Sequence, residues 1–266
     1  MKERSAELVE RVVDGAVVIL TLNDPAKGNA LSPSMLHALN SAIGDISRTP
    51  TVRAVVIAGR GRAFCLGADV AELEQILDGT PAADWESRLD ALAALVLGVR
   101  RLRCPVIAVL DGQVAGAGLA LALACDYRIA SNRVAMNLAY GRIGASTDGG
   151  ASWYLPRIVG HHRALDILLE QSVIRAQRAL ELGLVTAVVD RDGLMDAALA
   201  RARELTGLSP HAVGAAKRAL DASFSNSLAE HLKEEHEEFL AGLQTMDMRR
   251  GLVARSRGEW AEFEGN

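Results

Sequence analysis

The chain has 266 residues, of which 50% are hydrophobic, 23% are charged and 4% are aromatic, and its formal net charge is -4. This composition indicates a globular protein with a sizeable core and excludes disorder outside the chain ends. A nucleic-acid partner is excluded as well, because the chain has no basic excess to neutralise phosphates and only ten aromatic side chains (three Trp, three Tyr and four Phe) to stack on bases.

Three cysteines, Cys65, Cys104 and Cys125, are odd in number and lie in apolar runs. We therefore expect buried, reduced thiols and neither a disulfide framework nor a metal site. The longest charge-free apolar run, residues 112–125, is shorter than the roughly 20 residues that cross a bilayer. We expect a cytoplasmic protein with no membrane partner.

Strand, loop and helix patterns follow one another repeatedly along the chain. The expected strands cover residues 16–22, 53–59, 105–110 and, with a weaker pattern, 133–139. The expected helices begin at residue 33 after an N-cap, cover 70–77 and 116–124, and run from 149 toward 155. Such repetition predicts an α/β fold with parallel strands and helical crossovers, in which the loops after the strands meet at one edge of a sheet. Ligands of α/β sheets bind at that edge.

The sequence changes character near residue 207. A helix is predicted to open at Ser209–Pro210, and residues 228–243 are amphipathic with a charged run. We therefore divide the chain into a core that binds substrate, residues 1–206, and a helical region for oligomerisation, residues 207–266.

A glycine-rich segment, Gly112 to Gly118, directly follows a predicted strand and opens a predicted helix. Its spacing is that of a dinucleotide-binding turn, but it lies mid-chain, and no Tyr-x-x-x-Lys pair accompanies it. The same geometry also presents backbone N–H groups to developing negative charge. With the preceding loop, residues 61–70, it can form an oxyanion hole. By physics alone, a plain strand-to-helix turn with Asp69 near the cap fits that loop equally well.

These segments resemble a known family signature. Residues 61–70 and 111–126 are similar to the motifs of the crotonase superfamily, the enoyl-CoA hydratases and isomerases, as are residues 29–31, 155–160 and 179–185. The resemblance runs in order from about residue 10 to beyond residue 200. It implies a spiral of ββα units with a C-terminal helical region, assembled as a homotrimer or as a dimer of trimers.

The resemblance also implies the ligand, an acyl-CoA or enoyl-CoA thioester. Coenzyme A is then part of the substrate, and no separate cofactor or metal is expected. The thioester oxygen would lie between the backbone N–H groups of Ala68 and Ala117. The family often has glycine at the second position, but alanine keeps the N–H and accepts helical φ and ψ. The positions implied to bind substrate, largely through backbone contacts, are Lys27, Gly28, Ala30, Asp69, Val70, Ala71 and Gly116. Tyr140 and Trp153 are further implied substrate-binding positions, beside an apolar acyl pocket.

The catalytic carboxylates depart from the hydratase pattern. The two glutamates with which hydratases of this family activate water correspond here to Ala120 and Tyr140. What remains is Asp148, at a position that resembles the acidic residue of dienoyl-CoA and epoxyphenylacetyl-CoA isomerases, with Trp153 nearby. A single carboxylate beside an enolate-stabilising hole can move a proton between two carbons. The resemblance therefore implies double-bond isomerisation with Asp148 as acid and base.

Alternatives remain open at this point. Asp148 can instead cap the helix predicted to begin at Gly149. Tyr140 can donate a hydrogen bond or only form a wall of the pocket. The protein can be a weak enoyl-CoA hydratase, or a non-catalytic acyl-CoA-binding member that lost its carboxylates. Hydrolytic dehalogenation also uses an aspartate here, but it needs a histidine in the stretch that corresponds to residues 85–101, which has none.

Overall fold

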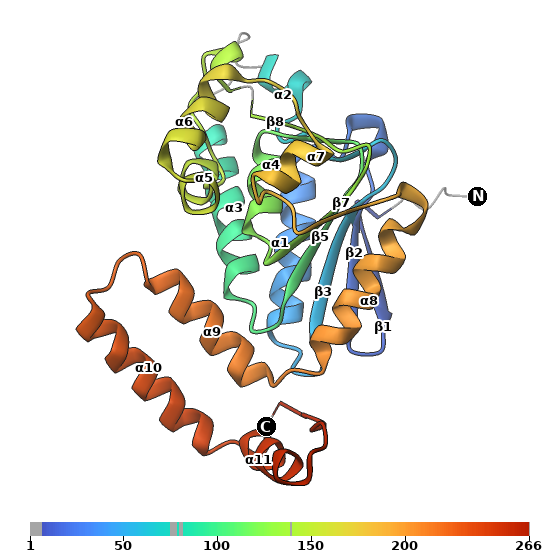
Figure 1. The fold of residues 1–266 in the computed structure, drawn as a ribbon. Coiled ribbons are helices and arrows are strands. Elements are labelled where there is room, and N and C mark those ends of the chain that lie inside the picture. Colours follow the sequence, from blue (N-terminus) through green and yellow to red (C-terminus); the bar gives the residue numbers. More distant parts are fainter. Residues whose placement is uncertain (1–6, 75–78, 80–81, 139, 266) are drawn as a thin grey trace.

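A six-stranded sheet runs through the middle of the structure, a computed structural model that describes residues 7–74, 79, 82–138 and 140–265 (Figure 1). Its order is β1-β2-β3-β5-β7-β10, with β1 antiparallel to β2 and all other neighbours parallel. The strands are β1 (Val9–Asp14), β2 (Val17–Leu22), β3 (Ala54–Gly59), β5 (Val106–Leu110), β7 (Tyr127–Ser131) and β10 (Ala187–Val189). Every residue of β5 is buried, which explains its uninterrupted apolar sequence.

A second, smaller sheet lies beside the first. It consists of β4 (Ala63–Cys65), β6 (Gln113–Ala115), β8 (Ala135–Asn137) and β9 (Ile174–Arg175). β4, β6 and β8 are parallel, and β9 pairs with β8 in the antiparallel sense. Each of β3, β5 and β7 is thus followed by one short strand of the second sheet before the chain enters a helix. The repeating unit is ββα, as the family resemblance implied, and the short strands β4 and β6 lie where the sequence predicted loops.

Helices cover both faces of the large sheet. α8 packs on one face against β3, β5 and β7, while α1, α3 and α4 lie on the other (Figure 1). Within the described ranges, no helix has the length and hydropathy needed to cross a membrane. The α-helices are α1 (Pro33–Ser47), α2 (Val70–Glu74), α3 (Ala82–Arg101), α4 (Ala117–Ala124), α5 (Ala151–Val159), α6 (His161–Glu170), α7 (Ala176–Glu181), α8 (Leu194–Thr206), α9 (Pro210–Ala222), α10 (Leu228–Leu243) and α11 (Met246–Arg257). Three 3₁₀ helices are Pro25–Lys27, Tyr140–Ile143 and Arg191–Gly193.

The third predicted unit is the one that the structure corrects most. Its strand in the large sheet is β7, which was not predicted, and the described part of the predicted strand, residues 133–138, forms the short strand β8 of the second sheet. Arg128 interrupts the apolar pattern of β7. Its guanidinium donates hydrogen bonds to the backbone oxygens of Leu184 (2.6 Å) and Cys125 (2.7 Å). The predicted helix 70–77 is described as far as Glu74, and residues 75–77 lie outside the described residues.

All three cysteines, Cys65, Cys104 and Cys125, are buried and free, as predicted. Burial raises the pKa of the Cys65 and Cys125 thiols to about 12 and that of Cys104 to about 11. These thiols therefore stay protonated at neutral pH. Among the described residues, no three His, Cys, Asp or Glu side chains gather as metal ligands would.

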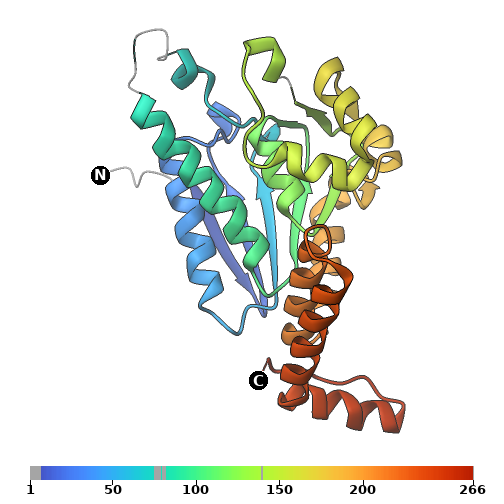
Figure 2. The ribbon, with the colours of Figure 1, turned by 90° about the vertical axis from the view of Figure 1, so that its left-hand side faces the viewer.

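Of the C-terminal helices, α9 contacts α3 of the core, and α10 packs against α9 farther from the sheets (Figures 1 and 2). α8 ends at Thr206, and α9 begins at Pro210 after Ser209. α10 starts at a capping box in which Ser227 and Glu230 satisfy each other's backbone N–H groups. The division into residues 1–206 and 207–266 stays a prediction.

The first turn of α4 lies directly against the end of β4. A Cβ atom added at Gly118 would lie 2.3 Å from the backbone oxygen of Cys65, a separation that real side chains do not adopt. Only glycine allows this approach of helix to strand. The contact fixes where α4 begins relative to the loop after β4.

We expect Gly118→Ala to destabilise the protein by about 1–3 kcal/mol, because the added methyl group must push the backbone of Cys65 away. The measurement is the midpoint of thermal or urea unfolding. A matched control is Gly44→Ala in α1, where the nearest atom to the added Cβ is the flexible end of Arg48 at 3.5 Å. That variant should gain up to about 1 kcal/mol from helix propensity. Equal midpoints for the two variants would contradict the close approach.

Candidate active site

Three predicted site residues follow the ends of three neighbouring strands. Ala68 comes three residues after β4, Ala117 two after β6 and Tyr140 three after β8. Because these strands are parallel neighbours, their carboxyl ends lie at one edge of the small sheet. The fold therefore gathers residues that are up to 72 positions apart in the sequence (140 minus 68).

The two candidate oxyanion donors lie on adjacent loops. A Cβ atom added at Gly67 would be 2.9 Å from the backbone nitrogen of Ala117, so the residue before Ala68 touches the start of α4. Ala117 is the first residue of α4, and the N-cap Gly116 has no side chain to occupy its N–H. Among the described residues, no protein group accepts a hydrogen bond from either N–H. Both donors are free to bind an oxygen that carries negative charge.

The predicted CoA-binding loops are joined to each other. The backbone N–H of Leu66 donates to the backbone oxygen of Gly28 at 3.1 Å. The ammonium of Lys27 lies 2.7 Å from a carboxylate oxygen of Asp69, which is buried, while the lysine side chain is half exposed. Hydrogen bonding to Asp69 and its charge raise the pKa of Lys27. A positive charge is thus held at the surface next to the loop that carries Ala68.

The remaining predicted CoA-binding positions lie on the same loops. Ala30 is buried beside the loop after β4, and Gly116 has a φ of 50° at the start of α4. Val70 and Ala71 open α2, and their side chains lie outside the described residues.

Asp148 accepts a hydrogen bond from Tyr140. The phenol oxygen lies 2.6 Å from Oδ1 of the carboxylate, and both side chains are partly buried. α5 begins at Ala151, and its N-cap is Gly150, with no side-chain hydrogen bond at the cap. The capping interpretation of Asp148 is therefore wrong. Of the two interpretations of Tyr140, the geometry supports the hydrogen-bond donor.

Burial sets the protonation of this pair. Desolvation raises the pKa of Asp148, and the hydrogen bond from Tyr140 opposes that effect. Desolvation, together with the negative charge of Asp148, raises the pKa of Tyr140, so the phenol keeps its proton. A carboxylate that is less acidic than usual is a better proton acceptor near neutral pH.

The turn that carries Asp148 packs against Ala120. A Cβ atom added at Gly149 would lie 2.9 Å from the methyl group of Ala120, which is itself buried. Ala120 lies three residues after Ala117 on α4, one helical turn along. The turn that carries Asp148 thus lies beside the first turns of α4, where Ala117 is a candidate oxyanion donor.

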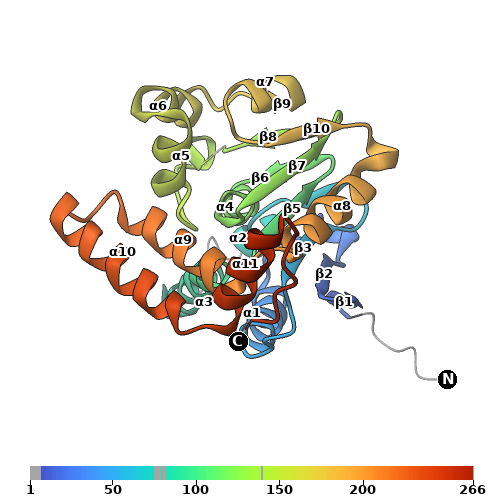
Figure 3. The same cartoon turned by 60° about the horizontal axis from the view of Figure 1, so that its bottom comes forward.

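Next to Asp148 opens a cavity of about 900 Å³ between α3, α5 and α9. Figure 3 shows α9 beside α3, with α5 nearby. Leu92 and Val96 of α3 and Trp153 of α5 give the cavity an apolar lining, with Asp148 at its edge. Trp153 was predicted from the sequence, whereas the contributions of α3 and α9 were not. The helical spacing of the apolar residues in α3 could have indicated its part in the lining. No pattern in the sequence indicates that α9 packs beside α3.

The chain matches a known family over nearly its whole length. The family model described as "Enoyl-CoA hydratase/isomerase" matches residues 13–264. The chain belongs to this family and is an enzyme of the crotonase superfamily.

Similar proteins include both isomerases and hydratases. A 1,2-epoxyphenylacetyl-CoA isomerase of Escherichia coli strain K12 is 32% identical over 261 residues, 97% of this chain and 99% of the relative. A probable enoyl-CoA hydratase, echA8 of Mycobacterium tuberculosis, is 33% identical over 248 residues, 93% of each chain. An enoyl-CoA hydratase structure from Polaromonas sp. JS666 matches with a TM-score of 0.91 at 31% identity, covering 96% of this chain and 99% of the other. These matches confirm the predicted fold.

We expect Tyr140→Phe to raise the pKa of Asp148 further, because the lost hydrogen bond favoured the charged carboxylate. The measurement is an NMR titration of the Asp148 carboxyl carbon, whose midpoint should move to higher pH. Tyr127→Phe is the control, since its hydroxyl contacts Arg201 and not Asp148. A midpoint that stays in place in Tyr140→Phe would show that the phenol does not act on this carboxylate.

Proposed function

We propose that this protein shifts a double bond in an acyl-CoA thioester, with Asp148 as both acid and base. The observation that carries the proposal is the position of Asp148. Burial raises the pKa of its carboxyl group, and the next residue, Gly149, packs against Ala120, which lies one helical turn after Ala117. No cofactor and no metal take part in this proposal.

The reaction requires only the movement of one proton. The thioester oxygen accepts hydrogen bonds from the N–H groups of Ala68 and Ala117, which stabilise an enolate. Asp148 removes a proton from one carbon of the acyl chain, and the electron pair passes through the enolate. The protonated Asp148 then returns the proton to a different carbon, and the double bond moves. The product is an isomer of the substrate, so no water is consumed.

Hydration fits the site less well. Ala120 supplies a methyl group where a water-activating carboxylate would be needed, and the hydroxyl of Tyr140 is engaged with Asp148. The similarity to an epoxyphenylacetyl-CoA isomerase supports the isomerase proposal. The similarity to probable enoyl-CoA hydratases supports the alternative.

The apolar cavity beside Asp148 is the proposed acyl pocket. Its lining of Leu92, Val96 and Trp153 would exclude water from the reacting carbons and bury an aliphatic or aromatic acyl group. The CoA moiety would lie along the loops of Lys27 and Asp69, where the lysine offers a positive charge to a phosphate.

We expect Asp148→Asn to abolish the exchange of the substrate's acidic protons with deuterated water, because an amide cannot accept the proton. Exchange would be followed by NMR on 3-enoyl-CoA esters, and binding of the same esters by calorimetry. The variant should stay folded at neutral pH, since burial disfavours the charge that it removes and Tyr140 can still donate to the amide oxygen.

The outcome that rejects the assignment is full proton exchange by folded Asp148→Asn protein. Hydration of crotonyl-CoA by the unchanged protein, at a rate above its isomerisation of 3-enoyl-CoA, would favour the hydratase instead. Tight ester binding with neither reaction would indicate loss of catalytic activity.

We also propose that the C-terminal helices assemble the protein as a trimer or as a dimer of trimers. α10 has a stripe of apolar side chains that the protomer leaves exposed, with exposed fractions between 44% for Leu243 and 74% for Leu228. The stripe consists of Leu228, Leu232, Phe239 and Leu243, whose spacings of 4, 7 and 4 residues place them on one helical face. Contiguous exposed apolar surface of this kind supports a subunit interface.

We expect Phe239→Glu to dissociate the assembly, because a carboxylate would be buried without a partner at the interface. Sedimentation velocity should show a trimer-based species for the unchanged protein and a monomer for the variant. Lys233→Glu, on the charged side of α10, is the control and should keep the assembly. A monomeric unchanged protein would contradict the proposal.

A further inference from the structure

Helix α9 is held against the core mainly by charged groups. Of the residues that the structure describes in α9 and α10, Gly214 alone is fully buried. Lys217 and Asp221 lie one turn apart on the face of α9 that meets the core, while Leu220 between them is 70% exposed. Apolar packing therefore contributes little to the position of α9.

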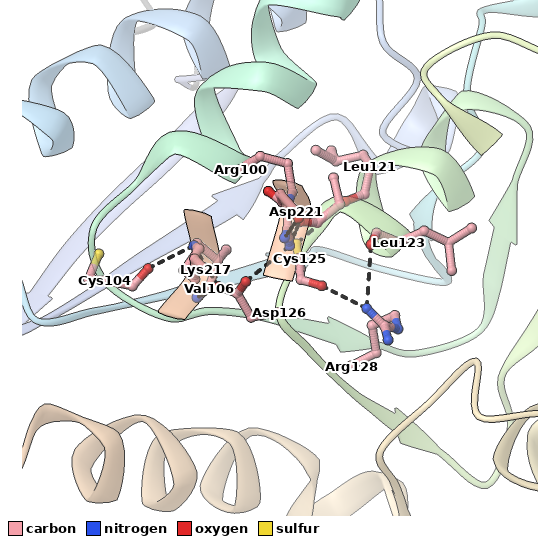
Figure 4. A network of polar contacts seen from close by, with 11 residues as sticks. Arg100, Cys104, Val106, Leu121, Leu123, Cys125, Asp126, Arg128, Lys217 and Asp221 are labelled. Carbon is pink, nitrogen blue, oxygen red and sulfur yellow. Dashed lines mark hydrogen bonds and ion pairs between the residues drawn. The ribbon is translucent and has the colours of Figure 1, made fainter. Parts of the chain in front are cut away.

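Four side chains make the attachment, and we call them the α9 clamp (Figure 4). They are Arg100 at the end of α3, Asp126 after α4, and Lys217 and Asp221 of α9. Lys217 Nζ lies 2.8 Å from Asp126 Oδ2, and Arg100 Nη2 lies 2.5 Å from Asp221 Oδ1. Arg100 Nη1 also contacts Asp126 Oδ1 at 3.1 Å, which closes the network.

Asp126 anchors the clamp in the core. Its Oδ2 also accepts the backbone N–H of Val106 in β5 at 2.9 Å, and Lys217 donates in addition to the backbone oxygen of Cys104 at 3.2 Å. Two cations face two carboxylates, so the charges balance. Because most of these groups are largely shielded from water, loss of one partner leaves an uncompensated charge on the others.

The clamp separates two hollows. On one side of α9 lies the acyl pocket of about 900 Å³, and on the other side a groove of about 590 Å³. Arg100, Lys217 and Asp221 line both. The contact between α3 and α9 at these residues therefore forms the wall between the acyl pocket and the groove. We call this wall the partition.

We propose that the α9 clamp sets the longest acyl chain that the protein accepts. From Leu92, which lies close to Gly149 next to Asp148, the apolar lining continues along α3 to the clamp at Arg100. Eight residues of helix correspond to about 12 Å. A longer acyl chain would press its methylene groups against charges that it cannot satisfy, which is unfavourable.

The experiment compares the binding of three saturated thioesters, butyryl-CoA, octanoyl-CoA and palmitoyl-CoA, by calorimetry on the full-length protein. The inference rests on the proposed acyl-CoA function, and binding by the unchanged protein tests that function separately. Because each methylene buried in the pocket strengthens binding about fourfold, affinity should rise from butyryl to octanoyl. It should then fall for palmitoyl, whose chain reaches beyond the clamp.

Asp221→Ala removes the carboxylate of the clamp that is most exposed, and it should open the partition. The ratio of palmitoyl-CoA to butyryl-CoA affinity should increase by about tenfold or more, as two or more further methylenes are buried. The control is Glu238→Gln, which breaks the exposed ion pair between Arg218 of α9 and α10. That control should leave the ratio unchanged.

Lys217→Met provides an independent second variant with a side chain of similar length, and it should shift the ratio in the same direction. An unchanged ratio in both folded clamp variants would overturn the inference, as would an equal shift in Glu238→Gln. Failure of the unchanged protein to bind any of the three thioesters would instead reject the proposed function. If Asp221→Ala does not fold, Lys217→Met alone decides.

Discussion

The parallel pairing of three short strands positions the rest of the site. β4, β6 and β8 end at one edge, and the chain turns there into α2, α4 and the 3₁₀ helix of Tyr140. The loops at this edge can lie close together because two glycines leave room. The backbone of Gly118 lies against the oxygen of Cys65, and the backbone of Gly67 lies against the nitrogen of Ala117. With side chains at these glycines, the two candidate oxyanion donors could not be neighbours. Backbone packing thus defines a site whose donors are themselves backbone groups.

Two carboxylates of the protomer, Asp148 and Asp126, have opposite electrostatic surroundings. At Asp148 a single carboxylate is placed where burial opposes its charge, and a neutral phenol is its hydrogen-bond partner. At Asp126 a carboxylate is matched by two cations and a backbone N–H, which stabilise its charge. The first arrangement suits a group that exchanges a proton, and the second suits a group that holds two helices together.

Local sequence patterns predicted the parts of the fold that depend on local physics. Continuous apolar runs indicated β3 and β5, and the pair Ser32–Pro33 indicated the start of α1, where Ser32 accepts the N–H of Met35. The strand β7 was missed because Arg128 interrupts its apolar pattern, and only the fold shows the backbone oxygens that bind the guanidinium. The α9 clamp was missed for a related reason. Its members lie up to 121 residues apart, and no periodicity links them.

The contact between Gly149 and Ala120 limits how the chemistry of this chain could change. A glutamate introduced at position 120 would have to enter the space that the Asp148 turn fills, since even a Cβ atom at Gly149 would approach the methyl group of Ala120 to 2.9 Å. Replacement of that one residue would therefore shift the turn that carries Asp148. A carboxylate at position 120 requires the turn after the 3₁₀ helix of Tyr140 to be rebuilt as well, so this scaffold does not accept the two changes independently of each other.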